Sequence, residues 1–157
     1  MTVHEVRVEV TPLQTNGMRD VLGDVVQRQL FADHGIDVGK VRSIRGYLIR
    51  SQYDAESIEP RVQDIFSDPI IEHGVTNTSI LDDKAFFPTP PSLTVTVGFK
   101  PGVTDNPGAA ANDGFKVLFP DGDSAISTYI SYAFLNLSDS IDHEWLASTL
   151  FNGLIEK

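Results

Sequence analysis

The stretch "KPGVTDNPG", Lys100 to Gly108, contains two glycines and two prolines within nine residues. It follows the run "SLTVTVGF", in which apolar and polar residues alternate, and this period of two predicts a half-buried strand. It opens the segment "DNPGAAANDGFKVLF", which we expect to be a helix. A glycine-rich turn between a strand and a helix either holds a phosphate at the helix start or only redirects the chain. The residues of the turn must decide between these two roles.

The composition of this turn favours a structural role over phosphate binding. Its pattern GxxDxxG is neither the dinucleotide-binding fingerprint nor a phosphate-binding loop, and no lysine follows the second glycine. Asp105 would place a carboxylate where a phosphate would sit, so we expect it to cap the helix N-terminus. Gly108 then permits close packing of the helix on the sheet. A third alternative is that the rigid, exposed turn docks onto a partner domain.

A related segment, "GMRDVLG", lies 85 positions earlier. The same shift aligns several pairs: Gly17 with Gly102, Asp20 with Asp105, Gly23 with Gly108, Tyr47 with Tyr132 and Phe66 with Phe151. With one residue deleted, "PIIE" falls on "GLIE", and with four extra residues allowed in the first loop Val6 and Val8 match Val95 and Val97. The period is far longer than that of solenoid repeats. The sequence therefore predicts the duplication of one folding unit.

The first half of the chain predicts the order of elements within that unit. Val6, Val8 and Val10 alternate as a strand, and "MRDVLGDVVQRQLFADHG" has helical spacing, with Asp20 as its N-cap and Gly35 as its C-cap. Val21, Leu22, Val25, Val26 and Leu30 are the apolar residues of that spacing.

The segment "DVGKVRSIRGYLIRSQY" is predicted to form two strands, Lys40–Arg45 and Tyr47–Gln52, separated at Gly46. A second helix, "DAESIEPRVQDIFSD", and a strand, "PIIEHGVTNTSIL", complete a ferredoxin-like β-α-β-β-α-β unit.

The second half repeats this order but ends early. "SAISTYISYAFLNL" is strand material, "DSIDHEWLASTLF" is a helix, and "GLIEK" begins a strand that ends at Lys157. We therefore expect a truncated last strand and a chain that is a fragment of a longer enzyme. The expected domains are unit one at 1–81, a proline-rich linker at 82–91 and unit two at 92–157. The expected fold class is α+β, with two ferredoxin-like units packed as an intramolecular pseudo-dimer.

Composition narrows the function classes. The 157 residues carry a formal net charge of −10, which argues against nucleic-acid binding, and contain no cysteine, which excludes disulfides and thiolate metal sites. No signal peptide or membrane span is apparent, so we expect a cytoplasmic protein without membrane contacts. The histidine in "DHEW" lacks the spacing of a metal motif, and no nucleophile motif is present, so we expect no metal site and no catalytic residue.

The order of these motifs resembles the PurS family. A strand, "KPGVTDNPG" opening a helix, the segment "VRSIRGYLI" and a helix ending in "FSDPIIE" carry the resemblance. Two such units in tandem are similar to the N-terminal region of large, single-chain phosphoribosylformylglycinamidine (FGAM) synthases. The first unit departs from the family pattern in its longer turn "TPLQTNGMRD", and the second has Gly153 where the pattern has proline.

The resemblance implies a non-catalytic assembly module in purine biosynthesis. In the family, such units hold the synthase and glutaminase domains together, so these domains are the implied partners. The parent ligase would use ATP and Mg²⁺, whereas no cofactor is expected in this chain. The candidate interaction residues are Lys100, Pro101, Gly102, Asp105 and Gly108 with Gly17, Asp20 and Gly23. Phe86 and Phe87 in the linker either cover the groove between the units or face the synthase domain.

A regulatory function is the alternative. Tandem ferredoxin-like units with a glycine-rich first turn also occur in ACT-type domains that bind amino acids. The sequence leaves open whether the chain forms a dimer and whether both units keep the same role.

Overall fold

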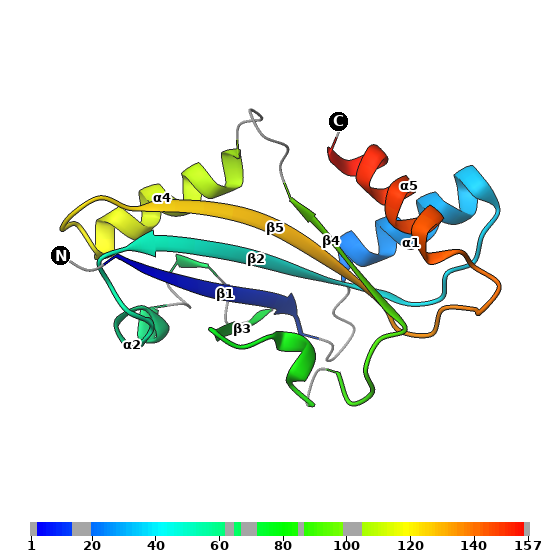
Figure 1. Cartoon of the computed structure of the whole chain (residues 1–157), viewed down its shortest axis with the longest axis horizontal. Coiled ribbons are helices and arrows are strands. Elements are labelled where there is room, and N and C mark those ends of the chain that lie inside the picture. Colours follow the sequence, from blue (N-terminus) through cyan, green and yellow to red (C-terminus); the bar gives the residue numbers. More distant parts are fainter. Residues whose placement is uncertain are drawn as a thin grey trace.

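The computed structural model describes residues 3–13, 20–61, 65–66, 72–84, 87–98 and 105–155. Within these residues five strands form one antiparallel sheet in the order β3-β1-β2-β5-β4 (Figure 1). The strands are β1 (His4–Pro12), β2 (Val41–Ser51), β3 (Glu72–Thr76), β4 (Leu93–Gly98) and β5 (Ala125–Phe134). The helices are α1 (Val21–His34), α2 (Ala55–Ile58), α4 (Asn106–Leu118) and α5 (His143–Ile155), with short 3₁₀ turns η1 (Glu59–Arg61) and η2 (Ile80–Asp82). The expected α+β class is confirmed.

Strand β2 is continuous through Gly46, so the predicted break into two strands is wrong. Gly46 pairs with Glu9 of β1 on one side and with Tyr129 of β5 on the other. A Cβ atom at this position would overlap the ring of Tyr129. The glycine therefore gives an aromatic ring room to cross the strand rather than turning the chain. In the described residues the first half consequently has the order β-α-β-α-β in place of the expected β-α-β-β-α-β.

The central pair of strands joins the two halves of the chain into one sheet. Strands β2 and β5 pair antiparallel from Val41 opposite Phe134 to Arg50 opposite Ala125. In this ladder Arg45 lies opposite Ile130, which follows it by 85 positions. The β2–β5 ladder is therefore symmetric about the pair Arg45 and Ile130, which the 85-residue shift of the sequence also aligns.

The strands that flank the central pair, β1 and β4, correct one detail of that alignment. Val8 lies opposite Tyr47, and Val95 lies opposite Tyr132. Because the two tyrosines correspond at the shift of 85, Val8 corresponds to Val95 rather than to Val97. The turn after β1 is therefore longer than the turn after β4 by two residues, not by four as the sequence predicts.

Each of the two main cores combines residues from both halves. In one core, Phe115 of α4 and Ile58 of α2 pack on the strands of the first half, namely on Val6, Val8, Val10, Tyr47 and Ile49, with Ile126 of β5 beside them. In the other, α1 lies on β2 and α5 lies on β4, and both share a core with β5: Val26, Leu30, Leu146 and Leu150 pack with Val41, Val95, Tyr132 and Phe134. Figure 1 shows α1 and α5 beside β4 and α4 near the opposite end of the long strands. The halves therefore interlock through their helices.

The buried side of α1 is narrower than its apolar pattern indicates. Gly23, Val26 and Leu30 are buried, whereas Val21 and Val25 are exposed. The close approach of Gly23 to the sheet selects the side of the helix that faces inward. The remaining apolar residues, Leu22 and Phe31 included, point away from the cores.

The last described residues are helical where a strand was expected. Helix α5 runs from His143 to Ile155, so Gly153 to Ile155 continue the helix instead of beginning a strand. Of the helices in the described part of the chain, none is long and apolar enough to cross a membrane.

Candidate functional site

The glycine turn of the second half ends in an aspartate cap with three hydrogen bonds. Asp105 Oδ1 accepts from the Gly108 N–H at 2.8 Å and from the Thr128 hydroxyl at 2.8 Å. Its Oδ2 accepts from the Thr128 N–H at 2.6 Å. The carboxylate thus caps α4 and ties the helix start to β5, as the capping preference of aspartate predicts.

The first half builds the same arrangement. Asp20 Oδ1 accepts from the Gly23 N–H at 2.9 Å and from the Ser43 hydroxyl at 2.7 Å, and Oδ2 accepts from the Ser43 N–H at 2.5 Å. Ser43 and Thr128 are themselves 85 positions apart. The strand residue of the motif therefore follows the same shift as the aspartate and the glycine, although the sequence comparison overlooked it because serine and threonine differ.

The glycines of both motifs are required by close packing. A Cβ atom on Gly23 would overlap the Val41 carbonyl, and one on Gly108 would overlap the Ile126 carbonyl. Val41 and Ile126 again stand 85 positions apart. This confirms the prediction that Gly108 permits close helix–sheet packing and extends it to Gly23.

The caps leave little capacity for anion binding at these helix starts. An anion binds a helix N-terminus through free N–H groups of the first turn. Each aspartate already accepts the N–H of a glycine in that turn and adds a negative charge beside it. The described part of both turns is therefore built as a structural joint.

Five candidates lie outside the described residues, namely Gly17, Phe86, Lys100, Pro101 and Gly102. Phe87, the remaining linker candidate, is buried within its own chain. It packs with Ile44, Ile80 and Ala133 on the sheet face opposite the helices, and the Arg42 guanidinium lies 4.6 Å from its ring centroid. Phe87 therefore packs on the sheet itself, beside residues of both halves, and contact with a synthase domain stays a prediction.

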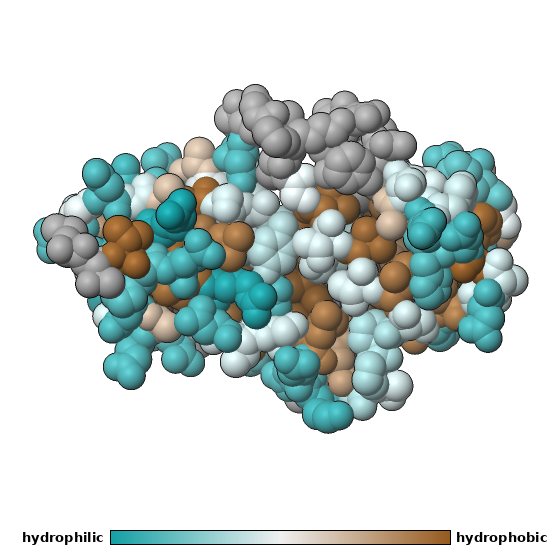
Figure 2. Space-filling model, in the orientation of Figure 1, coloured by the Kyte–Doolittle hydropathy of each residue, from teal (hydrophilic) through white to brown (hydrophobic). Residues whose placement is uncertain are grey.

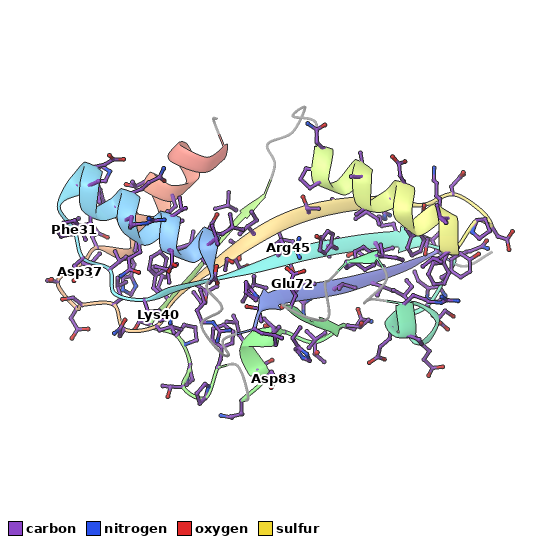
Figure 3. The ribbon with its side chains drawn as sticks, turned by 180° about the vertical axis from the view of Figure 1, so that it is seen from behind. Phe31, Asp37, Lys40, Arg45, Glu72 and Asp83 are labelled. Carbon is purple, nitrogen blue, oxygen red and sulfur yellow. The ribbon has the colours of Figure 1, made fainter. Side chains whose placement is uncertain are left out.

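Between the two helix starts, the centre of the sheet carries a polar group that sequence reasoning missed. Arg45 pairs with Glu72 of β3 and donates to the Phe66 carbonyl at 3.4 Å (Figure 3). Tyr47 packs beside them, with its ring 4.9 Å from that of Phe66. Burial raises the Tyr47 pKa, the Arg45 charge lowers it, and the charges of Glu72 and Asp105 raise it further. The feature of the sequence that could have indicated this polar group is Arg45 next to Gly46 in a predicted strand.

A second polar group on the opposite sheet face was also missed. Glu9 is buried, and its carboxylate accepts from the Ile80 N–H at 3.0 Å and from the Tyr129 hydroxyl at 2.6 Å. Burial raises the pKa of Tyr129 well above its usual value, and the hydrogen bond to Glu9 adds to the effect. Tyr129 thus spans Gly46 to fasten β5 to β1. Its role depends on pairing across three strands, which the sequence does not display.

Polar and apolar residues are interleaved on the side of the molecule seen in Figure 2. In the described residues no three His, Asp or Glu side chains gather in a way that could hold a metal ion. Two histidines contact other side chains: the rings of His34 and Trp145 meet edge-on with centroids 5.1 Å apart, and His73 Nε2 lies 3.6 Å from Asp83 Oδ2.

Together these features define an α+β protein with one antiparallel sheet and two equivalent aspartate-capped helix starts. Searches with this chain found no matching family model, curated protein or solved structure.

Proposed function

We propose that this chain is a non-catalytic, PurS-like assembly module of an FGAM synthase, with two related α+β units that pack as a pseudo-dimer. The observation that carries the proposal is the repeated helix start. Asp20, Gly23 and Ser43 reappear 85 positions later as Asp105, Gly108 and Thr128, with the same hydrogen bonds. In the second half Asp105 and Gly108 belong to the motif "KPGVTDNPG", which is similar to the family pattern.

The pairing of the two halves supports the pseudo-dimer. Two identical chains related by a two-fold axis make contacts in which a residue meets its own counterpart at the axis. Arg45 opposite Ile130 reproduces this relation within one chain. The central strands also cover edges that separate units would expose.

The chemistry of the helix starts supports assembly rather than catalysis. The carboxylates of Asp20 and Asp105 accept hydrogen bonds from backbone and hydroxyl donors of their own chain. These bonds fix both helix starts to the sheet, so the helix starts can be held rigidly for a partner. In the proposed complex the module keeps a glutaminase and a synthase together, so that ammonia passes between them without escaping.

Co-purification tests this function. A tagged form of the chain is mixed with the synthase and glutaminase polypeptides of an FGAM synthase from the same source. We expect all three to elute together and the chain to raise glutamine-dependent amidine formation, while ammonia-dependent formation changes little. A synthase that assembles fully and uses glutamine equally well without this chain contradicts the proposal.

A thermal-shift measurement separates this function from the regulatory alternative. An assembly module should show the same melting temperature with and without glutamine, other amino acids or nucleotides. Clear stabilisation by one of these small molecules would support an ACT-type sensor instead.

A further inference from the structure

The outer side of α1 is unusually apolar for a helix that already buries its other side. In the described residues six large hydrophobic side chains are exposed, and four of them lie on α1: Val21 (64%), Leu22 (40%), Val25 (36%) and Phe31 (61%). Single exposed apolar residues are ordinary, but a group of them on one element marks an interaction surface.

Helical spacing gathers most of these residues into one stripe. Val21, Val25 and Arg28 form one row at intervals of three or four residues, and Asp24, Arg28 and Phe31 form a second row beside it, so all five lie on one side of the helix. Gly23, Val26 and Leu30 occupy the opposite, buried side. The stripe therefore points away from the protein's own core.

The equivalent helix α4 lacks this stripe. The residues 85 positions later are Asn106, Ala109, Ala110, Asp113 and Lys116, which are small or polar. Both helices pack on the sheet through a buried glycine and a large apolar residue, Leu30 in α1 and Phe115 in α4. The apolar stripe of α1 is thus not required by the fold that the two halves share.

The stripe is complementary to itself. When a second α1 lies antiparallel with its midpoint against position 26, Asp24 meets the partner's Arg28 and Arg28 meets the partner's Asp24. In the same register Val21 meets the partner's Phe31, and Phe31 meets the partner's Val21. Such paired contacts are the signature of a two-fold interface, and the matched charges favour a second copy over an unrelated partner.

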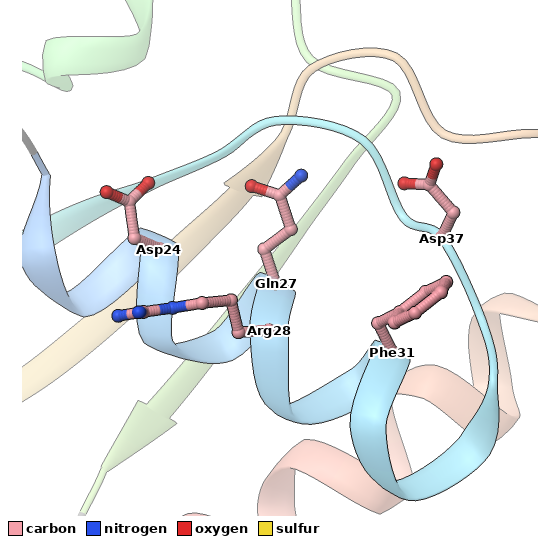
Figure 4. Close-up of a pocket in the computed structure, with 5 residues that line it drawn as sticks. All are labelled: Asp24, Gln27, Arg28, Phe31 and Asp37. Atoms are coloured by element: carbon pink, nitrogen blue, oxygen red, sulfur yellow. The ribbon is translucent and has the colours of Figure 1, made fainter.

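The surface around Phe31 offers space for this contact. An open hollow of about 420 Å³ is lined by Asp24, Gln27, Arg28, Phe31 and Asp37 (Figure 4). In the antiparallel register the partner's Val21 reaches the Phe31 end of this hollow. We propose that a second copy of this chain docks antiparallel on the outer side of α1, so that the chain forms a two-fold dimer.

Charge exchange tests the register directly. In sedimentation equilibrium of the whole chain we expect a concentration-dependent dimer. Asp24→Lys and Arg28→Glu should each weaken self-association by roughly tenfold or more, because each places like charges opposite one another. An equimolar mixture of the two variants should associate again, since opposite charges then meet at both contacts. Asp113→Lys at the matched position of α4 should leave the dimer unchanged.

Cross-linking supplies an independent measurement, because the chain contains no cysteine. Val25→Cys should give a covalent dimer with a short thiol cross-linker, whereas Ala110→Cys, its exposed counterpart on α4, should not. Circular dichroism checks that each variant is folded. A monomeric wild type at all concentrations, unchanged association of both charge variants, or a mixture that fails to associate would overturn the proposal. None of these results depends on binding to a synthase or glutaminase, so this inference can fail while the proposed function stands.

Discussion

The first and second halves of the chain build the same helix start and then surround it with different side chains. Asp20 and Asp105 make equivalent sets of hydrogen bonds, but Asp20 is buried and Asp105 is partly exposed. At the centre of the sheet Arg45 of the first half faces Ile130 of the second. The residues that the two halves share are those that fix the helix start to the sheet, whereas the surrounding residues differ. The two halves therefore serve as controls for each other.

The largest effect is expected where each half contributes to the core of the other. Leu30 and Phe115 correspond at the shift of 85, and both are buried. We expect Phe115→Ala to lower the free energy of unfolding by about 3–5 kcal/mol and Leu30→Ala by about 2–5 kcal/mol. Because the cores are shared, chemical denaturation should show one transition for both variants. Two separate transitions would show that the halves fold independently and contradict the interlocked arrangement.

The next effect separates the two caps. Alanine at position 20 removes a cap and leaves the Ser43 N–H without its acceptor in a buried place, which should cost roughly 3 kcal/mol in total. Asp105→Ala removes the same bonds where water can partly replace them, so about 2 kcal/mol is expected. Urea denaturation of the two variants measures the difference. Equal losses would mean that burial does not distinguish the caps, and Asp142→Ala at the start of α5 serves as an exposed comparison.

The elements that were predicted correctly from the sequence depend on local chemistry. Asp20 and Asp105 stand at helix starts, and Gly35 adopts a positive φ of 68° at the end of α1, as capping preferences predict. The wrong predictions concern places where residues far apart in the sequence determine the local structure. Gly46 appeared to break a strand because the Tyr129 ring that crosses it is 83 positions away.

Surfaces were harder to predict than elements for the same reason. Apolar residues lie on two sides of α1 at helical spacing. The sequence alone does not show that the side with Gly23, Val26 and Leu30 is buried while Val21 and Val25 are exposed. Phe87 in a proline-rich linker indicated a partner-facing residue or a cover for the groove, and tertiary structure places it on the sheet. The candidate site was found from its aspartates and glycines, but Ser43 and Thr128 could be added only from their hydrogen bonds.

A smaller effect concerns alkaline pH. Tyr129 occupies the position that Ile44 has in the first half, and burial together with the Glu9 hydrogen bond raises its pKa. Because the folded pKa exceeds the unfolded value of about 10, the stabilisation is complete below that pH and is lost as pH rises toward the folded pKa. We expect stability to fall above about pH 10 and Tyr129→Phe to flatten that fall. Tyr47 and Tyr132 also have raised pKa values, so the fall should be reduced rather than abolished. An identical dependence of stability on alkaline pH for wild type and Tyr129→Phe would show that ionisation of Tyr129 does not cause the fall.

The smallest effect is expected at the centre of symmetry, where Arg45→Ile would give both strands the same residue. Arg45 and Glu72 keep 36% and 16% of their side chains exposed, so solvent screens much of their attraction. Ile also favours a strand more than arginine does, which offsets part of the loss. We expect a net destabilisation of about 1 kcal/mol or less, shrinking further at high salt. Hydrogen exchange should locate the change at β3, because Arg45 links β2 to Glu72 and to the Phe66 carbonyl. A loss of several kcal/mol that spreads over the whole sheet would instead mean that the arginine holds the two halves together, and that the asymmetry at this pair is required by the fold.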